Sequence, residues 1–272
     1  MLFPDDTERA LQRVAQPTAP GAATELCSSL RELTPARIGL ERSGASLATR
    51  PLLDSFLAHA RARDAVHELV DEDQLTNEAC RLALPCLVIA TAARDRRSYL
   101  MRPDLGRRLS PEASAVLVPH AGDYDLVAVI ADGLSARAVQ CHALPVLAAA
   151  LSTLRAETWR VAPLVLVRQG RVAIGDAVAA QLRASAVAVL IGERPGLSSP
   201  DSMSAYLTWR PVPSTTDADR NCISNIRPEG VSYAEAAFKL VFLLREMRAR
   251  GFSGVMLKDD SENRLAHPYR IP

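Results

Sequence analysis

Three short apolar segments in the second half of the chain constrain its fold most strongly. They cover residues 125–131, 161–167 and 186–191, and each is almost continuously apolar instead of alternating between apolar and polar side chains. Strands that are buried on both faces have this pattern, because helices cover both sides of a parallel sheet. Stretches of helical length separate the segments, so we predict βαβ units and a mainly parallel sheet. Residues 206–209 are a candidate fourth strand.

Apolar side chains at helical spacing predict helices over residues 51–70, 77–84, 136–154 and 175–184. A last long helix is predicted from Ser232, which has Glu235 three residues later in a capping-box pattern, to Gly251. The predicted fold class is α/β, with a helical N-terminal region followed by a Rossmann-like, mainly parallel sheet domain. The expected parts are a partly flexible leader (1–32), a mostly helical domain (33–112), the Rossmann-like domain (113–257) and a polar tail (258–272).

Composition excludes several classes of protein. The chain has 32 Lys and Arg against 31 Asp and Glu, so it has no charge surplus for sequence-independent nucleic-acid binding. The longest nearly apolar stretch, 82–93, is interrupted by Pro85 and is too short to span a bilayer. Five scattered cysteines favour free thiols in a reducing compartment over a disulfide framework or a zinc site. The acidic N-terminus lacks the apolar core of a secretory signal. We therefore expect a cytoplasmic protein with no nucleic-acid or membrane partner.

Polar and glycine residues gather where the predicted strands end. We name four segments the rim loops: 132–135, 169–172 and 192–199, which follow strands, and 220–225, which precedes the last helix. Ligands of open parallel sheets bind outside the carboxyl ends of the strands, so we expect a ligand there. Glycines at these turns are also what any α/β domain needs. The chain has no G-x-G-x-x-G after its first predicted strand and no Walker A motif, which excludes the standard phosphate-binding loops for dinucleotides and nucleotides. It also lacks the G-x-S-x-G nucleophile elbow of α/β-hydrolases. The D-x-H-x-x-G loop, by which one class of cobalamin proteins supplies a histidine to cobalt, is absent too.

Three features of the sequence have two interpretations each. Glu193 either accepts a hydrogen bond from a ligand or pairs with its neighbour Arg194. Cys222 is a candidate nucleophile, but activation needs a base or a helix N-terminus, and spacing assigns no base. The arginine-rich segment, residues 94–108, either grips an anion or forms a salt-bridge surface between subunits.

Seven segments, taken in order, resemble the small (light) subunit of ethanolamine ammonia-lyase from about Leu33 to Lys258. They are L-T-P-A-R-I-G-L (33–40), H-A-R-A-R-D-A-V (59–66), Y-L-M-R-P-D-L-G-R-R-L (99–109), A-D-G-L-S-A (131–136), Q-G-R-V-A-I-G-D (169–176), I-G-E-R-P-G-L-S-S-P-D-S (191–202) and D-R-N-C-I-S-N-I-R-P-E-G-V-S-Y-A-E-A-A (219–237). The later motifs are long and specific.

The resemblance implies a cytosolic bacterial carbon–nitrogen lyase built from six large and six small chains. Such an enzyme uses adenosylcobalamin to convert ethanolamine, and similar vicinal amino alcohols, into acetaldehyde, or the corresponding oxo compound, and ammonia. The substrate site and the radical chemistry belong to the large subunit. The small chain covers the cobalamin and is inactive alone. The cofactor is expected base-on, with no histidine from this chain on cobalt.

Carried over by position, the family's cobalamin contacts fall on Val172, Glu193 and Cys222, and no catalytic or metal-binding residue falls on this chain. Val172 has no polar side chain and would act through its backbone or by apolar contact, whereas Glu193 would accept a hydrogen bond from an amide or hydroxyl. Some family members carry a longer N-terminal extension that directs them into a bacterial microcompartment. The short leader here departs from that pattern, so encapsulation is not expected.

Two other functions stay open. One is a self-sufficient α/β enzyme that acts on a nucleotide-like molecule with Cys222 or Glu193 as catalyst. The other is a pure assembly module whose arginine-rich segment docks a partner.

Overall fold

The computed structural model describes residues 27–34 and 36–261, so residues 1–26 of the expected leader and 262–272 of the expected tail lie outside the description. Contacts divide the chain into two compact units after Ala60, a division that does not coincide with the boundary expected between residues 112 and 113. In the first unit, residues 27–32 are helical. Strands β1 (Arg42–Ser43) and β2 (Ser46–Leu47) form a short antiparallel hairpin. The division falls within α3 (Thr49–His67).

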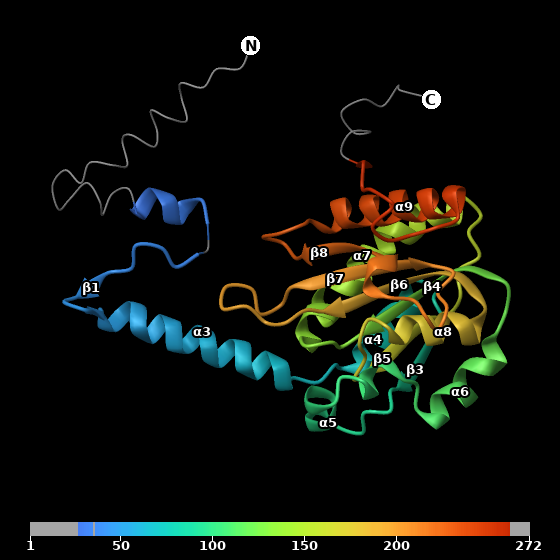
Figure 1. Ribbon diagram of the computed structural model, residues 1–272, viewed down its shortest axis with the longest axis horizontal. Helices are drawn as coiled ribbons and strands as arrows, with labels where there is room; N and C mark the ends of the chain where they lie inside the picture. The colour runs from blue at the N-terminus through green and yellow to red at the C-terminus, as the bar shows by residue number, and fades with distance from the viewer. Residues whose placement is uncertain (1–26, 35, 262–272) are drawn as a thin grey trace, which may run out of the picture. The chain divides into compact units, whose positions relative to one another are not determined.

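The second unit is built on a six-stranded sheet (Figure 1). Its strands are β3 (Cys86–Ala90), β4 (Tyr124–Ala131), β5 (Leu164–Arg168), β6 (Ala184–Gly192), β7 (Met203–Trp209) and β8 (Arg220–Ile226), arranged in the order β3-β5-β4-β6-β7-β8. The first four in that order run parallel, and β7 and β8 are antiparallel to their neighbours. The predicted α/β class with a mainly parallel sheet is confirmed.

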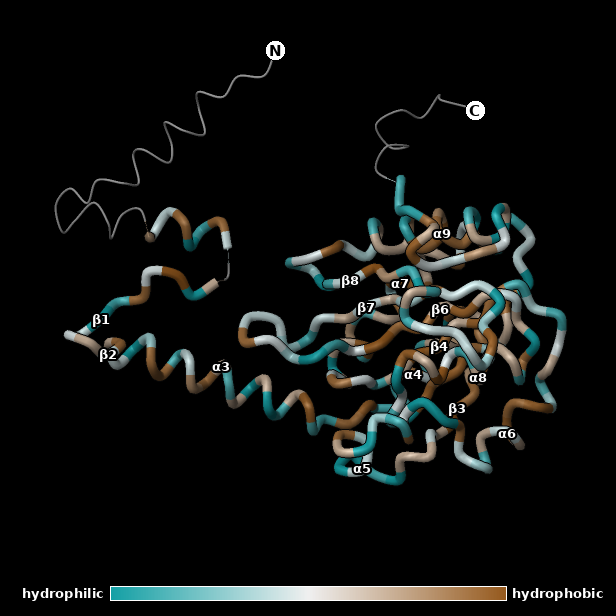
Figure 2. The backbone as a smooth tube through the Cα atoms, viewed as in Figure 1, coloured by the Kyte–Doolittle hydropathy of each residue, from teal (hydrophilic) through white to brown (hydrophobic). Residues whose placement is uncertain are grey.

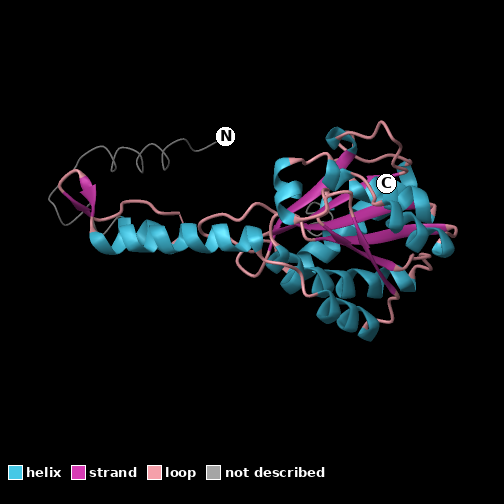
Figure 3. Ribbon diagram, turned by 90° about the horizontal axis from the view of Figure 1, so that it is seen from below, coloured by secondary structure: helices cyan, strands magenta, loops and turns pink. Residues whose placement is uncertain are grey.

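The helices form a layer on each face of the sheet (Figure 3). One layer holds α4 (Glu72–Arg81), α7 (Ala136–Ala156) and α9 (Tyr233–Arg250), and the other holds α6 (Pro111–Leu117) and α8 (Ile174–Leu182). Alternate residues of β4 belong to different clusters, since Leu126, Ala128 and Ile130 pack with the first layer and Val127 and Val129 pack with the second. Figure 2 shows the apolar residues concentrated along these inner strands. A strand that is buried on both faces is continuously apolar, which is the pattern that predicted it.

Several shorter elements connect these layers. They are α5 (Arg96–Met101) and the 3-10 helices η1 (Leu105–Arg107), η2 (Val118–His120) and η3 (Asp217–Asp219). The predicted caps of the last helix are confirmed: Ser232 accepts a hydrogen bond from the Glu235 backbone N–H, and Gly251 is left-handed at the C-terminus. None of the helices in the described ranges is both long enough and apolar enough to cross a membrane.

Two strands differ from the sequence-based expectations. β3 lies inside the apolar stretch 82–93, where no strand was predicted. The helix predicted over 77–84 corresponds to α4, which begins earlier and ends at Arg81, before the chain passes through Pro85 into the sheet. The prediction of a loop over 220–225 is wrong, since β8 pairs with β7 as an edge strand. An edge strand half exposed to water needs few apolar side chains, so its sequence resembles a loop.

The connections of the parallel strands reverse direction at β4. The chain passes from β4 through α7 to β5 on one side, and from β5 through α8 to β6 on the other side of β4. Ligands of doubly wound sheets bind where the strand order reverses, outside the carboxyl ends of the strands. The loops that follow β4 and β6 are therefore the expected site.

Candidate functional site

A pocket of about 360 Å³ opens at the carboxyl edge of the sheet, and we name it the rim pocket. The loops after β4, β5 and β6 all contribute to it, together with α5 and β7. Its lining includes Tyr99, Gly133, Val172, Gly192, Glu193 and Tyr206. Three of the four rim loops therefore meet at one cavity, as the strand-end rule predicts.

Val172 presents an apolar surface to this pocket. The residue is half-buried and packs against the core cluster that contains α8. Its carbonyl oxygen accepts a hydrogen bond from the Gly175 N–H at 3.1 Å, where the first turn of α8 begins. Val172 thus offers an apolar side chain to a ligand, while one of its backbone groups, the carbonyl, is engaged at the start of α8.

Glu193 is held in place through both its backbone and its carboxylate. Its N–H donates to the Ser202 carbonyl at 2.9 Å, and the Ser204 hydroxyl donates to its Oε1. Ser204 is fully buried, so the carboxylate is anchored from the protein side. Among the described residues no ion pair links Glu193 to Arg194, and the carboxylate bonds with Ser204 instead.

Cys222 lies on β8 opposite Tyr206 of β7. Although the residue is exposed overall, desolvation raises the pKa of its thiol, and hydrogen bonds with the hydroxyls of Tyr206 and Ser204 only partly oppose this rise. Burial likewise raises the pKa of Tyr206. The Cys222 sulfur is therefore a neutral thiol at pH 7, which is a poor nucleophile.

Ser204 links the three groups into one chain of contacts. Its hydroxyl donates its one proton to Glu193, and its side chain also acts on the thiol of Cys222, which lies opposite Tyr206 on the paired strand. Sequence reasoning did not single out Ser204 or Tyr206 as site residues. Alternation along a strand puts residues 204 and 206 on the same face, but only the pairing of β7 with β8 brings that face to Cys222.

A buried charged pair supports the wall of the rim pocket. Asp132 accepts a hydrogen bond from the Gly170 N–H at 2.9 Å and lies 3.5 Å from an Arg96 nitrogen. Burial raises the pKa of Asp132, and the nearby guanidinium opposes that rise. The guanidinium groups of Arg96 and Arg171 lie 4.8 and 4.1 Å from the centre of the Tyr99 ring.

Arg96 and Asp132 line another cavity, of about 510 Å³, which we name the second cavity. The described residues contain no cluster of three or more His, Cys, Asp or Glu placed to hold a metal ion. The rim pocket offers a carboxylate acceptor, arginine donors and an apolar side chain, and the neutral thiol of Cys222 lies behind it, opposite Tyr206. This set can bind a large polar-rimmed molecule, and it contains no activated nucleophile.

Comparison with known proteins identifies the family. The sequence model of the ethanolamine ammonia-lyase light chain matches residues 24–258. The ethanolamine ammonia-lyase small subunit of Azotobacter vinelandii is 55% identical over 237 residues, which cover 86% of this chain and 88% of that protein. Those of Ralstonia nicotianae and Pseudomonas aeruginosa are 52% identical, over 86% of this chain and 88% and 87% of the relatives. The chain belongs to the ethanolamine ammonia-lyase light-chain family and is a small subunit of that lyase.

Proposed function

We propose that this chain binds adenosylcobalamin at the rim pocket, where the large subunit of ethanolamine ammonia-lyase closes over it. One observation carries the proposal. Val172 and Glu193 come from different loops but line one pocket, and Cys222, from a third segment, joins it through Ser204 and Tyr206. These are the three positions at which the family resemblance implies contacts with the cofactor.

The chemistry of the pocket suits cobalamin. A corrin ring is broad and flat, with amide groups around its edge, so an apolar side chain beneath it and a carboxylate beside it are complementary. Glu193 would accept a hydrogen bond from an edge amide. Cys222 would contribute a backbone group or an unreactive thiol, since desolvation raises the pKa of that thiol.

The size of the pocket supports a shared site. At about 360 Å³ it lies at the low end of small-molecule pockets, and cobalamin exceeds an ordinary drug-sized ligand. The rest of the cofactor would need a second surface, and the relatives' name of small subunit implies a larger partner. When bound, adenosylcobalamin supplies a carbon radical that removes hydrogen from the substrate; the residues of this chain bind, orient and shield the cofactor.

The proposal extends to the complete enzyme. It places this chain with the large subunit in an assembly of six large and six small chains, acting on ethanolamine in the cytoplasm. All five cysteines are free thiols, which fits a reducing compartment.

A cofactor titration of the co-expressed complex tests the role of Glu193. Glu193→Gln keeps the shape of the side chain but removes the charge, and a hydrogen bond to a charged group is worth about 1.5–3 kcal/mol. We expect the dissociation constant for adenosylcobalamin, measured by equilibrium dialysis, to rise about tenfold or more. The ratio of small to large chains should stay unchanged.

Glu78→Gln is the matched control, since Glu78 is a half-buried residue of α4 whose carboxylate also accepts a side-chain hydrogen bond, from Gln74, but which does not line the rim pocket. Wild-type affinity in both variants would contradict the assignment of Glu193. Weaker binding in both would indicate a nonspecific effect of charge.

A further inference from the structure

The arginine-rich segment, residues 94–108, forms part of the wall of both cavities. Tyr99 lines the rim pocket, while Arg94, Asp95 and Arg96 line the second cavity. The outer side of the segment, with Arg97, Met101 and Arg107, lies next to these walls in the chain but lines neither cavity. A second chain that closes over a ligand in the rim pocket has to meet this segment.

Hydrogen bonds to the loops after β4 and β5 hold the inner side of the segment in place. The buried Tyr99 side chain donates its hydroxyl proton to the Gly170 carbonyl at 3.0 Å. The Arg171 N–H donates to the Gly106 carbonyl at 2.8 Å, and an Arg96 nitrogen donates to the Gly133 carbonyl at 2.8 Å. The backbone that carries the outer arginines is thus already ordered, which lowers the entropy cost of binding.

The outer side of the segment carries cations that the chain itself does not neutralise. The segment contains six arginines and two aspartates. Asp104 pairs with Arg102 at 2.9 Å and contacts Arg108 at 4.0 Å, and Asp95 caps α5 through the Ser98 N–H. Three exposed arginines have no ion pair with any of the residues that the structure describes: Arg94, Arg97 and Arg107.

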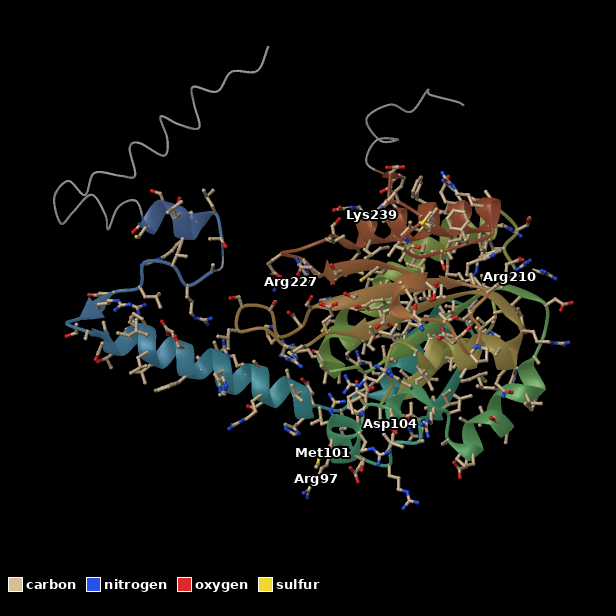
Figure 4. The ribbon with its side chains drawn as sticks, in the orientation of Figure 1. Arg97, Met101, Asp104, Arg210, Arg227 and Lys239 are labelled. Atoms are coloured by element: carbon tan, nitrogen blue, oxygen red, sulfur yellow. The ribbon has the colours of Figure 1, made fainter. Side chains whose placement is uncertain are left out.

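An exposed apolar side chain lies on the same segment as these arginines. Met101 is 68% exposed at the end of α5, and in Figure 4 it points away from the sheet together with Arg97. Arginine and methionine are both enriched at protein interfaces. The chain as a whole carries a formal net charge of only +1, so the positive charge is local to this surface.

We infer that the outer face of residues 94–108 is the docking surface for an acidic patch on the large subunit. The inference rests on the proposed function for the partner and for the side on which it closes. Unpaired arginines around an exposed methionine would orient the large subunit over the rim pocket, because complementary charge sets encounter rate and register. A large subunit bound to this surface would also lie next to the walls of both cavities.

Charge reversal in the co-expressed complex tests this surface. With an affinity tag on the large chain, Arg97→Glu/Arg107→Glu should reduce the amount of small chain that co-purifies and weaken association about tenfold or more at low ionic strength. Rising salt should narrow the difference from the wild type, because exposed charges are screened. Arg97→Lys/Arg107→Lys keeps the charge and should assemble normally.

Arg81→Glu is the matched control. Arg81 is an exposed arginine at the C-terminal end of α4, which leads into the start of β3 and so lies toward the opposite edge of the sheet. It should assemble like the wild type. If the glutamate pair fails to fold, Arg97→Gln/Arg107→Gln replaces it: weak assembly supports the inference, and normal assembly overturns it.

Two further outcomes would overturn the inference in different ways. A wild-type chain ratio for the reversed variant at every salt concentration means that the face does not dock. A wild-type ratio with weakened cobalamin binding means that the arginines contact the cofactor instead, and the proposed function then stands. Weak assembly of the reversed variant, combined with normal cobalamin binding by Glu193→Gln, keeps the docking surface and removes Glu193 from the cofactor site.

Discussion

Among single residues, Ser204 contacts two of the groups discussed for the rim pocket. It is fully buried on β7, and its hydroxyl contacts both Glu193 and Cys222. A buried hydroxyl costs free energy unless it is hydrogen-bonded, and these contacts satisfy it. The same contacts hold two of the predicted cofactor-binding side chains relative to each other.

Removing this hydroxyl should change the chemistry of Cys222. The Ser204 side chain lowers the pKa of the Cys222 thiol against the larger effect of desolvation, so Ser204→Ala should raise that pKa further. At a given pH the thiolate fraction falls, and alkylation of Cys222 by iodoacetamide, followed by peptide mass spectrometry in the complex, should slow. The stability cost is about 1 kcal/mol.

Ser224→Ala is the control, since Ser224 is an exposed residue of the same strand as Cys222. An unchanged pH profile for alkylation in Ser204→Ala would mean that the hydroxyl does not tune the thiol.

Among the elements, the ends of β4 and β6 approach each other unusually closely. Gly133 has φ +57°, a left-handed conformation that favours glycine, and the Leu134 N–H donates to the Gly192 carbonyl at 2.9 Å. A Cβ on Gly192 would lie 2.0 Å from the Ser135 carbonyl oxygen. Glycine at the end of β6 thus allows two rim loops to form one pocket wall.

A methyl group added at Gly192 should push apart the loops that follow β4 and β6. In Gly192→Ala the added methyl carbon would overlap backbone atoms that cannot move aside freely. We expect the free energy of unfolding, measured by urea denaturation, to fall by about 1–3 kcal/mol. Cobalamin affinity of the complex should fall as well. Gly196→Ala, in the same loop, would meet only the Ser199 hydroxyl at 2.9 Å and should cost less. Equal costs for the two variants would contradict the role of the close approach.

For the whole molecule, the two helix layers cover the faces of the sheet and leave its carboxyl edge open to the proposed ligand. The rim pocket and the second cavity both open there, and the arginine-rich segment borders them. The rim pocket is lined by the anchored carboxylate of Glu193, and the protonated thiol of Cys222 lies opposite Tyr206 on the paired strand; both are suited to binding. The chemistry of the lyase therefore falls to the partner in the proposed complex.

Activity should accordingly need both chains. With ethanolamine and adenosylcobalamin, we expect acetaldehyde from the co-expressed chains and none from this chain alone or from the large chain alone. Turnover by this chain alone, abolished by Cys222→Ser, would favour a self-sufficient enzyme. An assembled but inactive pair would mean that the family fold is kept while the substrate differs.

The sequence by itself determined the elements whose causes are local. The strands β4, β5 and β6 were predictable because burial on both faces requires a continuous apolar run, and the ends of α9 were predictable because Ser232 and Gly251 cap it through neighbouring backbone groups. Val172, Glu193 and Cys222 were named through resemblance, and their contact with cobalamin stays a prediction. β8 escaped prediction because an edge strand with polar residues needs a partner to define it.

Only the tertiary structure decided how the site is joined together. The pairing of Tyr206 with Cys222 sets which side chains surround the thiol, and the reversal at β4 sets which loops share the pocket. Both depend on contacts between segments far apart in the chain, and strand register is set by burial of whole faces of the sheet. The local sequence pattern does not show which distant segments come into contact. The role of Ser204 and the position of the arginine-rich segment beside the two cavities could therefore be seen only in the folded chain.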